Sequence, residues 1–252
     1  MIDLEKAKKA FVDYTNEYDV NNKFIKLKID HSLRVMEYSR KIAENMNLTK
    51  QQVDLATLIG LLHDIARFEQ WKRFETYSDS ISIDHGDFAV ELLENNNFIR
   101  KFIDTNQYDD IIKIAIKNHN KYKIEELEGE KLLQAKIIKD ADKLDIFYQI
   151  ATQYYKDPRI TETQEISEDF LKEFKMRQCV HKRANSTDLD EIVLIISFIY
   201  DIYFEYSFKI LLEEKYIQRI FEQFDFKSPK VNEEVNSIIE IALEFINDKV
   251  KN

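Results

Sequence analysis

Apolar residues recur with helical spacing along nearly the whole chain. Between residues 23 and 46, for example, Leu33, Met36 and Ile42 fall near one face of a helix. Pairs of strands with hairpin signals are not evident in the sequence. The pattern therefore predicts an all-α fold. The helices that it predicts are 4–18, 23–46, 50–62, 83–95, 108–119, 130–155, 167–177, 188–206, 208–224 and 230–250.

Polar residues with capping chemistry separate the predicted helices. Thr49-Lys50-Gln51-Gln52 has the pattern of a capping box, in which the Thr hydroxyl and the Gln amide satisfy backbone amides at the start of a helix. Ser228-Pro229 is a similar start for the last helix. The polar stretch 156–165 is the expected joint between two domains. These domains are residues 1–155 and a C-terminal helical extension, 156–252, which is expected to pack on the same core.

The composition narrows the choice of fold and of phosphate site. The chain has 252 residues but only three glycines and two prolines. Because these two types make up about 12% of an average domain, turn-rich sandwiches, barrels and propellers are disfavoured. The glycines Gly60, Gly86 and Gly129 stand far apart, so the sequence has no G-x-G-x-x-G loop and no P-loop. Any phosphate-binding site in this chain must therefore be built from something other than a glycine-rich loop.

The charge balance and the single cysteine indicate a cytoplasmic protein. Lys and Arg number 37 and Asp and Glu 47, a net charge of −10 that argues against strong binding to nucleic acid or to an anionic membrane. Cys179 alone forms neither an intramolecular disulfide nor an all-thiolate metal site. The first residues lack the apolar core of a signal peptide. The most apolar stretch, 192–204, is too short to span a bilayer.

Histidines and aspartates form the one constellation that predicts chemistry. His31 lies on a predicted helix, and His63-Asp64 ends an apolar one. With one Asp of the acidic cluster at 140–145, they offer two imidazoles and two carboxylates. This mixture suits Mn, Fe, Co, Ni or Mg better than a structural zinc ion. Four protein ligands on a six-coordinate ion leave places for water and substrate oxygen, and the ion lowers the pKa of a bound water. The set therefore predicts a metal-dependent hydrolase.

Each part of this set has a structural alternative when it is considered alone. His31 would be a helix-surface or satisfied core histidine, and residues 140–145 would form a solvated acidic face. The doublet, however, follows Leu61 and Leu62 on an apolar helix, where an unpartnered ionic pair is costly to bury. The order of the residues taken together favours the metal site.

The same residues resemble the HD domain superfamily of metal-dependent phosphohydrolases over roughly residues 22 to 150. The superfamily pattern is an early helical His, an apolar run that ends in His-Asp, and a later Asp. The segments that carry the likeness are His31-Ser32-Leu33-Arg34-Val35, Gly60-Leu61-Leu62-His63-Asp64-Ile65-Ala66-Arg67 and Ala141-Asp142-Lys143-Leu144-Asp145. The resemblance implies an HD-domain helical bundle with His31, His63, Asp64 and Asp142 as metal ligands. Its Ala-Asp-Lys-Leu context selects Asp142 over Asp140 and Asp145.

The resemblance also implies an activity and a second set of ligands. Members of the superfamily include nucleotide phosphatases, triphosphohydrolases and cyclic nucleotide or dinucleotide phosphodiesterases. Arg67 stands where one subgroup has a Glu that serves as proton donor, and the Gly-Tyr-Pro element of the cyclic-dinucleotide subgroup is missing. His85 and His119 fall where binuclear members place further ligands. They would hold a second ion, or else contact substrate phosphate or orient a ligand.

A phosphate substrate needs local positive charge in this acidic chain. Arg67, three residues after Asp64, is the first candidate, because a guanidinium can grip two phosphoryl oxygens. Arg34 follows His31 at the same interval, and Lys143 adjoins Asp142; a salt bridge is the alternative for each. The remaining candidates are Lys121 and Lys123, at the edge of the opening, and Trp71 and Phe74, which would stack on a base or pack in the core.

The sequence as a whole predicts a cytoplasmic metal-dependent phosphohydrolase with one or two divalent ions. Its substrate is expected to be a small phosphate ester, with a nucleotide favoured, attacked at phosphorus by metal-activated water. Asp64, Arg67 and Lys143 are the predicted catalytic residues, with Asp64 as proton acceptor. A cyclic nucleotide or dinucleotide phosphodiesterase and a non-catalytic metal- or nucleotide-binding regulatory protein are the alternatives. His181 falls outside the pattern, and residues 160–252 would complete the core, wall the pocket or form a homodimer.

Overall fold

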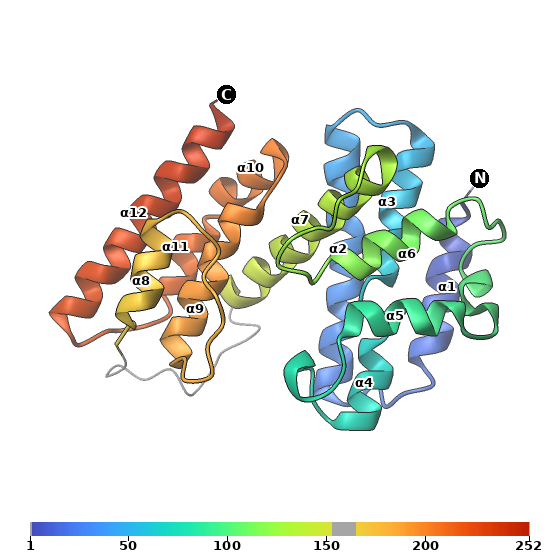
Figure 1. Cartoon of the computed structure of the whole chain (residues 1–252), viewed down its shortest axis with the longest axis horizontal. Helices are drawn as coiled ribbons and strands as arrows, with labels where there is room; N and C mark the ends of the chain where they lie inside the picture. Colours follow the sequence, from blue (N-terminus) through green and yellow to red (C-terminus); the bar gives the residue numbers. More distant parts are fainter. Residues whose placement is uncertain (1, 153–164, 252) are drawn as a thin grey trace. The chain divides into compact units, whose positions relative to one another are not determined.

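The computed structural model describes residues 2–152 and 165–251, and these form helices without a strand (Figure 1). The all-α prediction is therefore confirmed. The α-helices are α1 Leu4–Thr15, α2 Lys23–Asn45, α3 Lys50–Leu62, α4 Arg67–Phe74, α5 His85–Glu94, α6 Asp109–Asn118, α7 Gly129–Ala151, α8 Glu168–Lys175, α9 Asp188–Ile196, α10 Glu205–Glu213, α11 Tyr216–Phe221 and α12 Pro229–Val250. Short 3-10 helices lie at η1 Asp79–Ile81, η2 Asn95–Lys101 and η3 Ser197–Asp201.

The chain divides into two compact units, residues 1–142 and 143–252, and the division falls inside α7. The predicted domain boundary after residue 155 stays a prediction. Most of the predicted joint, residues 156–164, lies outside the described residues, as does the end of the helix predicted for 130–155. The two units are described separately below.

Helix starts followed the sequence better than helix ends. Thr49 forms the predicted capping box with Gln52, and Ser228 caps α12 with Pro229 in its first turn. The single helix predicted for 188–206 is wrong, because α9 ends at Ile196 and is followed by η3 and an extended Ile202. The Ser197 hydroxyl donates to the Leu194 carbonyl oxygen and accepts from the Val180 amide, so it competes with continued helix.

Two other helix predictions are corrected. The helix predicted for 208–224 is two helices, since Lys215 adopts a left-handed backbone (φ 52°) between α10 and α11. Helix α4 was missed altogether, and it begins three residues after His63-Asp64 with Arg67. The first predicted helix, 4–18, ends at Thr15.

Helices α2 and α3 pack closely in the N-terminal unit because Gly60 has no side chain. A Cβ atom at Gly60 would lie 2.6 Å from Ser39 Oγ and 2.9 Å from Met36 Cα. Helix α3 is buried all round from Val53 to Leu62, as expected of a helix that is apolar on every face. This close approach brings the middle of α2 against the end of α3, where the His-Asp doublet begins.

Helices α5 and α6 make a second close contact in the same unit. A Cβ atom at Gly86 would lie 2.7 Å from Asn120 Oδ1 and 3.1 Å from the Lys117 carbonyl oxygen. Any larger residue at position 86 would therefore push the segment after α6 away from the start of α5. The contact sets the distance between His85, at the start of α5, and His119, just after α6.

The C-terminal unit is built on aromatic and aliphatic residues. Helix α8 packs on α9, and α12 packs on α8, α10 and α11. Phe170, Phe174 and Leu211 are among its buried residues. One of its buried carboxylates, Asp190, caps the start of α9 and accepts hydrogen bonds from the amides of Ser167 and Thr187.

Candidate metal centre

Three predicted ligands meet where α2 faces the end of α3. His31 projects from α2, His63 is the residue that follows α3, and Asp64 comes next. The Nε2 atoms of His31 and His63 lie 3.1 Å apart, and Asp64 Oδ2 lies 3.3 Å from the first and 3.7 Å from the second. All three residues are buried, and their ligand atoms are close enough together to share one metal ion.

Helix α7 adds Asp142 to this group. Its Oδ1 lies 3.2 Å from His31 Nε2 and 3.7 Å from His63 Nε2. The structure thus brings together all four residues that the sequence grouped as one ligand set. The set combines two imidazole nitrogens with two carboxylates, a mixture that suits divalent first-row metals and magnesium.

The other oxygen of Asp64 faces a second group. Its Oδ1 lies 3.4 Å from His85 Nε2 and 3.7 Å from His119 Nε2, and these two nitrogens lie 3.0 Å apart. Asp64, His85 and His119 likewise have ligand atoms close enough to share an ion. One carboxylate therefore stands between two pairs of imidazoles, with one oxygen toward each pair.

The hydrogen bonds of the histidines leave their Nε2 atoms facing inward. A carbonyl oxygen only accepts, so His63 Nδ1 donates to Gly60 O at 2.8 Å, and His119 Nδ1 donates to Ile116 O at 2.6 Å. His85 Nδ1 contacts Asp79 Oδ2 at 2.5 Å. Burial lowers the pKa of His63, and burial together with Arg67 lowers the pKa of His85 to about 4.

A divalent cation fits these donors. At neutral pH His63 and His85 are neutral, and each turns an Nε2 lone pair toward an oxygen of the Asp64 carboxylate. Burial alone would raise the pKa of Asp64, but Lys28 and the histidines hold it well below its usual value, so the carboxylate is ionised. Lone pairs and a buried anion repel one another unless positive charge lies between them. The chemistry of the donors is therefore that of a cation site.

Residues 29–146 match the model of the HD domain family. The chain contains an HD domain. The match covers all six histidine and aspartate residues of the two groups, and the HD superfamily is one of all-α, metal-dependent phosphohydrolases. No curated protein and no solved structure shows significant similarity to the chain. Within the described ranges, none of the helices combines the length and the apolar character needed to cross a membrane.

Arg67 of the HD domain lies beside Asp64 and is held from one side. Its Nη1 donates to Gln70 Oε1, to the Tyr77 carbonyl oxygen and to Asp79 Oδ1 at 2.6 to 2.8 Å. Its Nε lies 3.5 Å from Asp64 Oδ1, too far for a good hydrogen bond, and is buried without a partner. Its Nη2 lies 3.3 Å from His85 Nε2. The edge of the guanidinium that carries Nε and Nη2 therefore faces the centre.

Two residues of the N-terminal unit that contact the centre were missed at the sequence level. Lys28 Nζ donates to Asp64 Oδ2 at 2.8 Å, and Asp79 bonds both His85 and Arg67. The position of Lys28, one turn before His31 on the same helix, was a signal that could have found it. Asp79 lies in η1 and offered no periodic signal, because the segment between α4 and α5 is irregular.

The other residues predicted for the site either form ion pairs outside the two histidine groups or are partly or fully exposed to solvent. Lys143 Nζ forms an ion pair with Asp201 at 2.8 Å, and Arg34 lies half-buried on α2. Lys121 Nζ pairs with Asp84 and Asp87, each at 2.8 Å. The parts that Lys143 and Arg34 play in catalysis or phosphate binding stay predictions. Lys123 and Phe74 are exposed, and His181 contacts Glu173.

Trp71 contacts other aromatic rings of the N-terminal unit. Its ring stacks on Phe24 at a centroid distance of 4.2 Å and lies 5.0 Å from the ring of Tyr77. These contacts favour packing over stacking on a base, the other role considered for Trp71.

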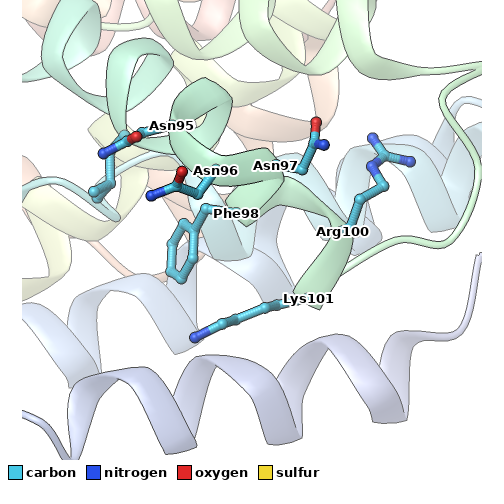
Figure 2. Close-up of a pocket in the computed structure, with 7 residues that line it drawn as sticks. Asn95, Asn96, Asn97, Phe98, Arg100 and Lys101 are labelled. Atoms are coloured by element: carbon cyan, nitrogen blue, oxygen red, sulfur yellow. The ribbon is translucent and has the colours of Figure 1, made fainter.

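A cavity of about 490 Å³ lies elsewhere in the HD domain, around η2 (Figure 2). Its lining includes three consecutive asparagines, of which Asn96 and Asn97 have left-handed backbones (φ 50° and 56°), together with Phe98 and Lys101. The ligand candidates of the two histidine groups are not among the residues that line it.

Proposed function

We propose that the protein is a metal-dependent phosphohydrolase that acts on a small phosphate ester, with a nucleotide as the favoured substrate. One observation carries the proposal. Asp64 is buried and ionised, and each of its two oxygens faces a separate pair of histidine Nε2 atoms. The hydrogen bond from Lys28 accounts for one contact of Asp64, whereas ions shared by these groups would account for the four imidazole nitrogens that face it.

The proposed ligands form two sets that share Asp64. His31, His63, Asp64 and Asp142 would hold one divalent ion of Mn, Fe, Co, Ni or Mg. His85 and His119 would hold a second ion with the other Asp64 oxygen. When bound, such ions polarise a phosphoryl oxygen and lower the pKa of a bound water toward neutrality. Asp64 can accept a proton only while one of its oxygens stays free, so this role belongs to the protein with a single ion.

Arg67 is the proposed phosphate-binding residue. Three acceptors on Nη1 fix its orientation, so its Nε–H and Nη2–H are directed at the centre before any substrate arrives. Parallel donors of this kind match two oxygens of one phosphate. The unpartnered Nε atom is costly to bury and would gain an acceptor when phosphate binds.

A second candidate activity is hydrolysis of a phosphodiester, including a cyclic nucleotide. The observation that favours it is the second histidine pair, because sites with two ions commonly clamp both the attacking and the leaving oxygen. A cytoplasmic location and a homodimer stay predictions. A non-catalytic protein that binds metal or nucleotide is the remaining alternative, and it predicts binding without turnover.

The test is phosphate release from a panel of nucleotide monoesters, other monoesters and cyclic diesters, with Mn²⁺, Co²⁺, Ni²⁺, Fe²⁺ or Mg²⁺. We expect metal-dependent turnover with a preference for monoesters. A clear preference for diesters would favour the second candidate. No turnover with any ion, despite bound metal, would contradict both.

A further inference from the structure

Lys28 places an ammonium group at a proposed ligand oxygen. It lies three residues before His31 on α2, so both side chains leave the same face of the helix. Lys28 Nζ donates to Asp64 Oδ2 at 2.8 Å, and the same oxygen lies 3.3 Å from His31 Nε2. The side chain of Lys28 is only 17% exposed. A long cationic side chain is thus held in a mostly buried place beside the candidate metal centre.

An ion in the His31 and His63 group would share Asp64 Oδ2 with this ammonium. Two positive charges around one carboxylate oxygen repel each other, and the low-dielectric surroundings strengthen the repulsion. Lys28 would therefore be better satisfied by an additional anion than by Asp64 alone. An ammonium has three N–H donors, so it can keep Asp64 as one acceptor and take an oxygen of another group as the next.

Tyr77 keeps this ammonium at the centre. Lys28 Nζ lies 5.5 Å from the centroid of the Tyr77 ring, and Arg67 Cζ lies 5.6 Å from the same ring. The Tyr77 hydroxyl donates to the Phe24 carbonyl oxygen at 2.9 Å, which ties the ring to the first turn of α2. The Tyr77 ring thus contacts two cations: Lys28, beside Asp64 Oδ2, and Arg67, beside Asp64 Oδ1.

We propose that Lys28 is a substrate-binding residue whose ammonium donates to a phosphoryl oxygen of the phosphate ester. This inference rests on the proposed function. It adds to Arg67 a second cation, on the Oδ2 side of Asp64, so that the phosphate is held by side chains from two helices, α2 and α4. It also supplies local positive charge in a chain whose net charge is −10.

The experiment measures the binding of Mn²⁺, and then of inorganic phosphate to the Mn²⁺-loaded protein, by isothermal titration calorimetry. Lys28→Met removes the charge, Lys28→Arg keeps it, and Lys26→Met is the matched control. Lys26 lies on the same helix but is exposed and pairs with Asp30. Lys28→Gln, which keeps a donor for Asp64 without the charge, gives the same comparison if the methionine variant does not fold.

We expect Lys28→Met to weaken phosphate binding by about tenfold or more, the loss of one charge-assisted hydrogen bond. Its affinity for Mn²⁺ should be unchanged or higher, because a competing cation is gone. Lys28→Arg should retain most of the phosphate affinity, and Lys26→Met should match the wild type. A purely structural role for Lys28 would instead weaken the binding of both ligands.

Three results would overturn the inference. Phosphate binding by Lys28→Met as tight as that of the wild type would refute it and leave the proposed function standing. A parallel loss of Mn²⁺ and phosphate affinity would show that Lys28 only maintains the metal centre. A Mn²⁺-loaded wild type that neither binds phosphate nor releases it from any ester would refute the proposed function, and Lys28 as a substrate-binding residue with it.

Discussion

The two units bury carboxylates in opposite ways. Asp190, in the C-terminal unit, is completely buried and accepts hydrogen bonds from the Ser167 and Thr187 amides and from the Ser167 hydroxyl. Asp64, in the HD domain, is also buried and accepts a hydrogen bond from Lys28, but it faces four imidazole Nε2 atoms, two of them on neutral rings. The first carboxylate is satisfied by backbone and hydroxyl donors, whereas the second has one ammonium donor, Lys28, and otherwise faces lone pairs that suit a further cation.

This difference shows how the groups around a buried carboxylate distinguish a cation-binding site from a helix cap. A buried charge with backbone donors around it caps a helix and stabilises the chain. A buried charge among lone pairs costs stability unless a cation joins it. The following changes separate the two cases, and they are ordered by the size of the expected effect.

The largest effect is expected from His63→Ala in the HD domain. His63 offers a neutral Nε2 to the first ligand set, so its loss should lower metal-dependent phosphate release more than the ~10- to 100-fold that loss of an outer partner costs. The measurement is steady-state turnover of the best ester at saturating Mn²⁺. Activity within threefold of the wild type would remove His63 from the ligand set.

Chelation is expected to destabilise the HD domain and to leave the C-terminal unit unchanged. A ligand at 100 times its Kd stabilises a folded unit by about 2.7 kcal/mol. Hydrogen exchange with and without Mn²⁺ should therefore show slower exchange with metal around His31, His63, His85 and His119, and no change around Asp190. Protection that rises equally in both units would contradict the contrast drawn between them.

Asp79→Asn tests the support of the second histidine pair. Asp79 Oδ2 contacts His85 Nδ1, and Asp79 Oδ1 accepts from Arg67, so the variant should loosen both side chains. We expect a loss of about 10- to 100-fold in activity or metal affinity. Ser80→Ala, at an exposed neighbouring position, is the control. Equal activity in both variants would show that Asp79 does not orient His85.

The smallest effect on activity is expected from Asp190→Ala. The variant leaves the partly buried amides of Ser167 and Thr187 without their acceptor, which should cost roughly 1 to 3 kcal/mol of unfolding free energy. Thermal or urea unfolding measures the loss, and turnover at a temperature where the variant stays folded should equal that of the wild type. If Asp190→Ala were as stable as the wild type but turned over substrate more slowly, Asp190 would have a role in activity and not in stability, which would contradict the contrast between the two units.

The sequence predicted the fold class and the grouping of the ligand candidates because both depend on local patterns. Helical spacing was enough for the all-α fold, and the order of His31, His63-Asp64 and an Asp of the 140–145 cluster was enough to propose one metal set; the resemblance to the HD superfamily selected Asp142 within that cluster. Helix ends were harder. The apolar pattern continues past Ile196, but a serine hydroxyl that competes for backbone groups ends the helix there.

The parts of the site that were missed depend on tertiary contacts. Lys28 and Asp79 reach Asp64 and His85 only after α2, α4 and the irregular segment between α4 and α5 have packed together. The anchoring of Arg67 through Nη1 could not be foreseen either, since Gln70, Tyr77 and Asp79 converge on it in the folded chain.

The most direct measurement is the metal content of the purified protein after dialysis against Mn²⁺, for the wild type, Asp64→Ala and Asp190→Ala. Asp64 offers oxygens to both ligand sets, so the metal-centre hypothesis predicts bound metal in the wild type and in Asp190→Ala. It predicts little or none in Asp64→Ala. Equal metal content in all three proteins, with equal phosphate release, would contradict it.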